Sequence, residues 1–217
     1  MSRVAHAILV CVISVAFALG SDVDHLWQQA QSIYGEDGKV AVQHWQNLFE
    51  QAQTENTRQQ LTTVNDFFNS SIVFGNDVQI WGESDYWATP LETLVHRHGD
   101  CEDFSIAKYI SLRRLGFNDK QLRLVYVKAD VGSAKPQAHM VLAYYSIPTA
   151  EPLILDNLNQ EIWPASKRTD LTPVFSFNSE GLWVGSDPDS RVRKPETRLS
   201  RWREVLLRMR AEGVDWF

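Results

Sequence analysis

Cysteine is scarce in this chain of 217 residues, which contains only Cys11 and Cys101. Two cysteines cannot form a dense disulfide framework, so the sequence is not that of a small disulfide-stapled scaffold. A chain of this length, with 44% hydrophobic residues, can bury a core without such staples. Internal repeats and low-complexity linkers are missing as well. We therefore expect one domain over residues 21–217.

Positive charge is also in deficit. The chain has 21 Lys and Arg residues against 27 Asp and Glu residues, which gives a net charge of −6 and a pI of about 5.5. We find no dense basic patch in the sequence. This charge balance argues against nucleic acid as a main partner.

A long apolar run occurs only at the N-terminus, from Ala7 to Leu19, and Arg3 precedes it. Small residues at the spacing of a cleavage site follow, in Ala16-Phe17-Ala18 and Ala18-Leu19-Gly20. This pattern predicts a signal peptide over residues 1–20 and an exported protein that does not span the membrane after cleavage. An uncleaved anchor is the alternative, although the run is short for a transmembrane helix.

Removal of that segment would leave Cys101 as the single cysteine. An unpaired thiol in an oxidising compartment is a liability unless it has a chemical role. Residues 105–115 have the apolar spacing of an amphipathic helix, and Gly116 is a natural stop. We expect Cys101 in the first turn of this helix, where the helix dipole favours the nucleophilic thiolate. The alternative is a small buried residue with no chemical role.

The order of the other elements indicates an α+β domain, with helices first and an antiparallel sheet second. Residues 24–70 are predicted to be helical, and Thr89-Pro90 with Glu92 has the pattern of a capping box that opens a helix over 90–97. The predicted strands and the closing helix follow in the order 122–128, 138–145, 152–156, 173–177, 182–184 and 198–212. The turn between the last strand and this helix contains Asp187 and Asp189.

His139 opens one predicted strand and Asp156 closes the next. In an antiparallel pair these two positions lie at the same end, so we expect the carboxylate to contact the imidazole. The carboxylate would fix the tautomer of His139, whose other ring nitrogen would face Cys101. His98 is the one rival histidine. Each residue taken alone is also compatible with ordinary packing.

Several segments resemble the bacterial transglutaminase-like cysteine proteinases, and among them the LapG type of periplasmic protease. These segments are residues 85–90, Gly99-Asp-Cys-Glu-Asp103, Ala138-His-Met-Val141 and Leu155-Asp-Asn157. The resemblance implies a papain-like or transglutaminase-like core and a catalytic triad of Cys101, His139 and Asp156. It also implies calcium dependence.

The same resemblance implies a function in the periplasm. A protease of this type cleaves the N-terminal region of a large cell-surface adhesin near a di-alanine site, which releases the adhesin and disperses biofilm. An inner-membrane cyclic-di-GMP receptor sequesters the protease when the nucleotide is abundant. Two alternatives stay open: transglutaminase chemistry on the same three residues, and a non-catalytic module that docks on a receptor.

The residues themselves give a separate reason to expect a metal. Asp100, Glu102 and Asp103 place three negative charges beside the thiol, which raises its pKa and opposes the effect of the helix end. A bound Ca²⁺ with oxygen ligands would neutralise this cluster. We therefore predict these three side chains as metal ligands. The alternative is that they only complement the helix dipole.

Thioester chemistry also needs donors for the oxyanion. The backbone N–H of Cys101 is the natural first donor. We expect the second from the upstream segment, in which Asn76, Gln79 and the Trp81 indole are all suitable, and the sequence does not choose among them.

Overall fold

The computed structural model describes residues 3–185, 191–192 and 200–215. The predicted turn with Asp187 and Asp189 lies outside these residues, and so do the first two residues of the predicted closing helix. The first helix begins at Arg3 and includes the segment predicted to be a signal peptide, whose cleavage stays a prediction. Within the described part of the chain, no helix combines the length and the apolar character needed to cross a membrane.

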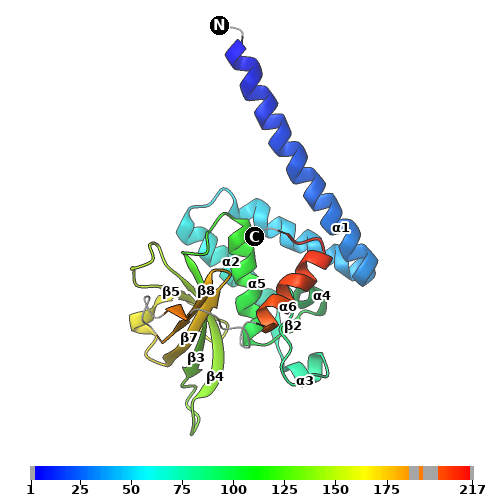
Figure 1. Ribbon diagram of the computed structural model, residues 1–217. Helices are drawn as coiled ribbons and strands as arrows, with labels where there is room; N and C mark the ends of the chain where they lie inside the picture. The colour runs from blue at the N-terminus through cyan, green and yellow to red at the C-terminus, as the bar shows by residue number, and fades with distance from the viewer. Residues whose placement is uncertain (1–2, 186–190, 193–199, 216–217) are drawn as a thin grey trace.

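The α+β prediction is confirmed, with helices packed on one antiparallel sheet (Figure 1). The helices of four or more residues are α1 (Arg3–Ala52), α2 (Thr57–Ser71), α3 (Asp77–Ile80), α4 (Pro90–His96), α5 (Cys101–Arg114) and α6 (Ser200–Ala211). A short 3-10 helix covers Ala165–Lys167. The strands are β1 (Val73–Phe74), β2 (His98–Gly99), β3 (Leu122–Ala129), β4 (Gln137–Tyr144), β5 (Leu153–Leu155), β6 (Trp163–Pro164), β7 (Leu171–Asn178), β8 (Gly181–Val184) and β9 (Arg191–Val192).

Local signals in the sequence set the helix boundaries. Thr89 caps α4 through the backbone N–H of Glu92, and the Glu92 side chain accepts from the N–H of Thr89, so the predicted capping box is present. Gly116, with φ of 95°, follows α5 in the left-handed region that favours glycine. Gly35, with φ of 64°, has a non-helical conformation inside α1 and interrupts the predicted helical segment 24–70.

The seven-stranded sheet has the order β6-β5-β4-β3-β7-β8-β9. Strands β3, β4 and β5 pair antiparallel in chain order and form a meander. Strand β7 then pairs with β3 on the other side, so the complete sheet is not one meander. Helix α5 lies between the sheet and α2 (Figure 1), and its buried residues join the main core, which includes Tyr109, Ile110 and Leu124.

Helix α6 is attached to the helical layer by a buried carboxylate. Glu212, directly after α6, accepts hydrogen bonds at one side-chain oxygen from the hydroxyls of Tyr34, at 2.7 Å, and Thr89, at 2.9 Å. Its other oxygen is buried without a partner. Burial raises the pKa of Glu212 to about 7, although both hydroxyls and Arg208 oppose the shift.

This carboxyl makes stability depend on pH. Because its folded pKa is raised above the usual 4.5, its favourable contribution is complete below pH 4.5 and is lost as the pH rises through about 7. Urea unfolding should show that, between pH 5 and 8, Glu212→Gln loses roughly 2 kcal/mol less stability than wild type. Glu204→Gln, an exposed substitution on α6, is the control. An identical pH dependence in wild type and Glu212→Gln would contradict this assignment.

Candidate active site

Cys101 is the first residue of α5, as predicted for a residue in the first helical turn. Asp100 is the N-cap, and its side chain accepts from the backbone N–H of Glu102 at 3.1 Å. Asp103 accepts in return from the backbone N–H of Asp100 at 3.2 Å. The acidic residues on either side of the thiol therefore also form the capping box that begins the helix.

The structure brings His139 and Asp156 together at the same end of β4 and β5. His139 Nε2 lies 2.7 Å from Asp156 Oδ1, and both side chains are buried. The second oxygen, Oδ2, accepts from the buried guanidinium of Arg168 at 2.7 Å. Burial alone would raise the pKa of Asp156, but hydrogen bonds from His139, the N–H of Leu158 and Arg168 lower it to about 2. The carboxylate is thus ionised and fixed at both oxygens.

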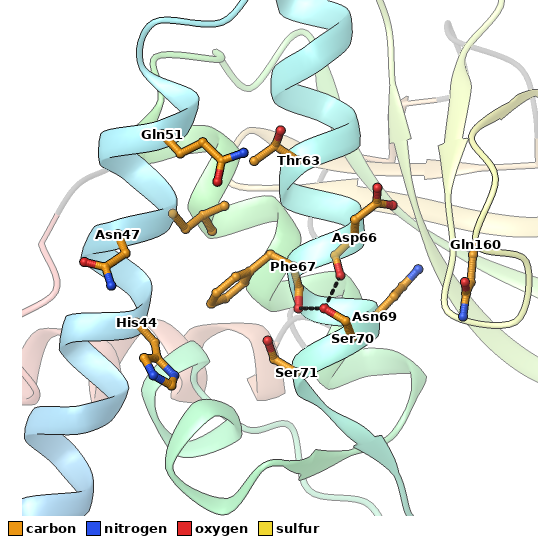
Figure 2. A pocket seen from close by; sticks show the side chains of 11 residues that line it. His44, Asn47, Gln51, Thr63, Asp66, Phe67, Asn69, Ser70, Ser71 and Gln160 are labelled. Atoms are coloured by element: carbon orange, nitrogen blue, oxygen red, sulfur yellow. Dashed lines mark hydrogen bonds between the residues drawn. The ribbon is translucent and has the colours of Figure 1, made fainter.

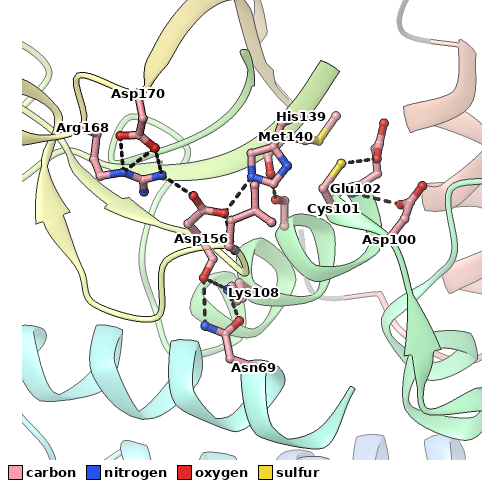
Figure 3. A network of polar contacts seen from close by, with 12 residues as sticks. Asn69, Asp100, Cys101, Glu102, Lys108, His139, Met140, Asp156, Arg168 and Asp170 are labelled. Carbon is pink, nitrogen blue, oxygen red and sulfur yellow. Dashed lines mark hydrogen bonds and ion pairs between the residues drawn. The ribbon is translucent and has the colours of Figure 1, made fainter. Parts of the chain in front are cut away.

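In Figure 3 the imidazole of His139 lies between the carboxylate of Asp156 and the thiol of Cys101. Because Nε2 contacts Asp156, Nδ1 is the ring nitrogen left for the thiol. The thiol itself donates to Glu102 Oε2 at 2.8 Å instead of contacting His139. Burial, followed by the charges of Glu102 and Asp100, raises the pKa of the Cys101 thiol well above its usual range. Burial and the acidic neighbours therefore disfavour the thiolate more than the helix end favours it.

The acidic residues divide into two overlapping groups. In one, Asp100 and Glu102 have oxygens within 4.8 Å of each other and of the Cys101 sulfur. In the other, Asp100 and Asp103 converge with Asp77 from α3, again within 4.8 Å. Asp77 is not among the metal ligands predicted from the sequence.

The group of Asp77, Asp100 and Asp103 has the features of a cation site. Asp77 Oδ2 accepts from the N–H of Tyr86 at 2.7 Å, whereas Asp77 Oδ1 is buried with no partner. Burial raises the pKa of all three carboxyls, and negative neighbours raise it further. Hard oxygen donors that repel one another around an unpaired buried oxygen fit an oxygen-preferring cation such as Ca²⁺.

The rival histidine, His98, makes no hydrogen bond with Cys101 or Asp156 among the described residues. His98 lies in β2, where its ring is exposed and Nδ1 is 2.9 Å from the carbonyl of His96. Of the suggested oxyanion donors, Asn76 caps α3 through its side-chain oxygen. The Trp81 ring packs against the rings of Tyr86 and His96 with its indole nitrogen buried and unpartnered. The identity of the second donor stays a prediction.

A separate polar cavity of about 640 Å³ lies between α1 and α2 (Figure 2). Its lining includes His44, Gln51, Asp66 and Asn69, but none of the three predicted catalytic residues. It therefore does not provide the substrate cleft for Cys101.

The thiol at a helix end, next to a buried histidine–carboxylate pair on a sheet, is the arrangement of a cysteine hydrolase of the papain type. Residues 36–184 match the family model of the bacterial transglutaminase-like cysteine proteinases, BTLCP, and the chain belongs to this family. The chain is therefore a cysteine protease by family.

Solved structures of LapG from Legionella pneumophila are similar to this chain. One is 38% identical, with a TM-score of 0.71, and the match covers 86% of this chain and 97% of LapG. The EGTA-treated form gives 38% identity, a TM-score of 0.73 and the same coverage. The calcium-bound form gives 40%, 0.71, 86% and 98%. No curated protein sequence matches the chain.

Proposed function

We propose that this protein is a periplasmic, calcium-dependent cysteine endopeptidase with Cys101, His139 and Asp156 as its triad. Its substrate is the N-terminal region of a large surface adhesin, cut near a di-alanine site, and the cut releases the adhesin and promotes biofilm dispersal. A cyclic-di-GMP receptor of the inner membrane regulates it by sequestration. The observation that carries the chemistry is the contact of 2.7 Å between His139 and Asp156 beside the helix end that bears Cys101.

The proposed reaction begins when a rotation about χ1 moves the thiol from Glu102 to His139. Nδ1 of His139 takes the proton, and the thiolate attacks the scissile carbonyl carbon. The oxyanion is stabilised by the N–H of Cys101 and a second donor. The resulting imidazolium, stabilised by Asp156, protonates the leaving amine. His139 then deprotonates a water that hydrolyses the thioester and regenerates the thiol.

In this proposal Ca²⁺ is held by Asp77, Asp100 and Asp103, and Glu102 is connected to this group only through Asp100, with which it shares the other acidic group. The similarity to calcium-bound LapG supports the choice of metal. A bound dication would neutralise negative charge beside the thiol, and Glu102 would compete less well with His139 for the thiol proton.

The most direct test uses residues 21–217 and the N-terminal fragment of the host's large adhesin. We expect one cut in the presence of calcium and none with excess EGTA. A cut that EGTA does not affect would refute the calcium proposal and leave the protease proposal intact. Absence of a cut in both conditions, with incorporation of an amine into a glutamine substrate, would favour the transglutaminase alternative.

Asp77→Asn should weaken calcium binding, because it removes the negative charge of a predicted ligand whose free oxygen is buried. We expect the affinity for Ca²⁺ to fall about 10- to 100-fold. Loss of a residue that only supports a metal ligand already has an effect of this size. Isothermal titration with CaCl₂ measures the affinity. Asp37→Asn, at an exposed position in α1, is the matched control. Equal affinity in Asp77→Asn and wild type would exclude Asp77 as a ligand.

A further inference from the structure

One face of α5 carries more than the nucleophile. Cys101, Ser105 and Lys108 are separated by four and three residues, so they lie above one another on the same side of the helix. Ser105 is 2% exposed and Lys108 is 1% exposed. Both have polar side chains directed to the two elements that carry the other predicted triad residues, as the following contacts show.

Ser105 connects α5 to the strand of His139. Its hydroxyl donates to the backbone carbonyl of Met140 at 3.0 Å, and Met140 directly follows His139 in β4. The backbone N–H of Met140 in turn donates a hydrogen bond to the sulfur of Cys101, which lowers the pKa of the thiol. The strand is therefore tied to the helix one turn from the nucleophile.

Lys108 connects α5 to the residue Asp156 itself (Figure 3). Its ammonium lies 3.1 Å from the backbone carbonyl of Asp156, 2.9 Å from Asn65 Oδ1 and 2.7 Å from Asn69 Oδ1. An ammonium has three N–H donors, so these three acceptors satisfy it completely. Asn69 Nδ2 donates to the same carbonyl at 2.8 Å, so both donors fix the backbone of Asp156.

Burial of the Lys108 ammonium costs folding free energy that packing alone does not require. The three acceptors are neutral, and burial lowers the pKa of Lys108 to about 7. Burying an ammonium without a directly bonded carboxylate disfavours the folded state, and an apolar side chain of similar length would avoid that cost. What lysine provides and an apolar side chain lacks is the three N–H donors that bind Asn65, Asn69 and the carbonyl of Asp156.

We propose that Ser105 and Lys108 are positioning residues, which hold the strand of His139 and the backbone of Asp156 at a fixed distance from Cys101 on the same helix. The proposal rests on the proposed protease function, because it assigns these three residues to one reaction. In this proposal α5 holds all three triad residues in place. Cys101 is its first residue, Ser105 binds the strand of His139 one turn later, and Lys108 binds the backbone of Asp156 two turns later.

The test compares Ser105→Ala and Lys108→Met with Ser111→Ala. Ser111 is on the same helix and is fully buried, but its hydroxyl accepts from Trp45 Nε1 at 2.8 Å and not from the triad elements. We expect kcat for adhesin cleavage to fall several-fold in Ser105→Ala and about 10- to 100-fold in Lys108→Met, with KM nearly unchanged. Ser111→Ala should lower the melting temperature and keep kcat.

A second readout does not need the substrate. The rate at which iodoacetamide alkylates Cys101 depends on proton transfer to His139, so its pH profile should move to higher pH in Ser105→Ala and Lys108→Met only. Wild-type kcat and an unshifted profile in both variants would overturn the proposal. If Lys108→Met does not fold, the pair Ser105→Ala and Ser111→Ala decides. Failure of wild type to cleave the adhesin would refute the proposed function, whereas the alkylation profiles would still test the positioning.

Discussion

Cys101→Ala is expected to abolish adhesin cleavage and to leave the fold intact. The variant removes the only group at the start of α5 that can form a thioester, and no second cysteine occurs in residues 21–217. Loss of a protease nucleophile costs on the order of 10⁶-fold in kcat, as in subtilisin. A time course of product formation on a gel, together with a thermal melt, measures both properties.

The melt is an essential part of that experiment. The thiol is partly buried and donates a hydrogen bond to Glu102. The variant therefore loses this hydrogen bond and keeps the rest of the helix end. We expect little change in melting temperature. Cleavage by folded Cys101→Ala at a rate within tenfold of wild type would show that the reaction does not proceed through this thiol.

The second large effect is expected for Asp156→Asn. Asparagine keeps the size of the side chain but offers either an oxygen or an NH₂ group where the carboxylate accepts from both His139 and Arg168. It therefore favours the wrong tautomer of the imidazole and does not stabilise the imidazolium. The corresponding change in a serine protease lowers kcat by about 10⁴-fold, and we expect a loss of that order here.

Asp170→Asn provides the matched control for this variant. Asp170 binds the same guanidinium of Arg168 at 2.7 Å, but its side chain is 42% exposed and does not contact His139. We expect kcat to stay within a few-fold of wild type, because Asp156 still pairs with the guanidinium of Arg168 and still contacts His139. Equal losses in the two variants would mean that Arg168, and not the contact between His139 and Asp156, determines the rate.

Much of this site follows from local patterns in the sequence. The capping residues at Thr89, the helix that begins at Cys101 and the stop at Gly116 are short-range signals, and the structure has all three. The meeting of His139 with Asp156 could also be predicted, because the start of one strand and the end of its antiparallel neighbour share an edge.

Contacts that depend on the path of the chain in space could not be predicted. Asp77 reaches Asp100 and Asp103 because β1 pairs in parallel with β2, and strands of two residues have no detectable period. Arg168 reaches Asp156 from an irregular segment with no motif. Strand β7 pairs with β3 and not with β5. The hydrophobic alternation of a strand shows which of its faces is buried, but it does not identify the neighbouring strand.

The central claim is that one thiol, Cys101, carries the reaction. Stepwise alkylation of residues 21–217 with iodoacetamide, in the presence of calcium, tests it most directly, because this segment has a single cysteine. Mass spectrometry gives the labelled fraction and the adhesin assay gives the residual activity. We predict that activity falls in proportion to the label and reaches zero at one label per molecule. Complete labelling of Cys101 with cleavage activity retained would contradict the account.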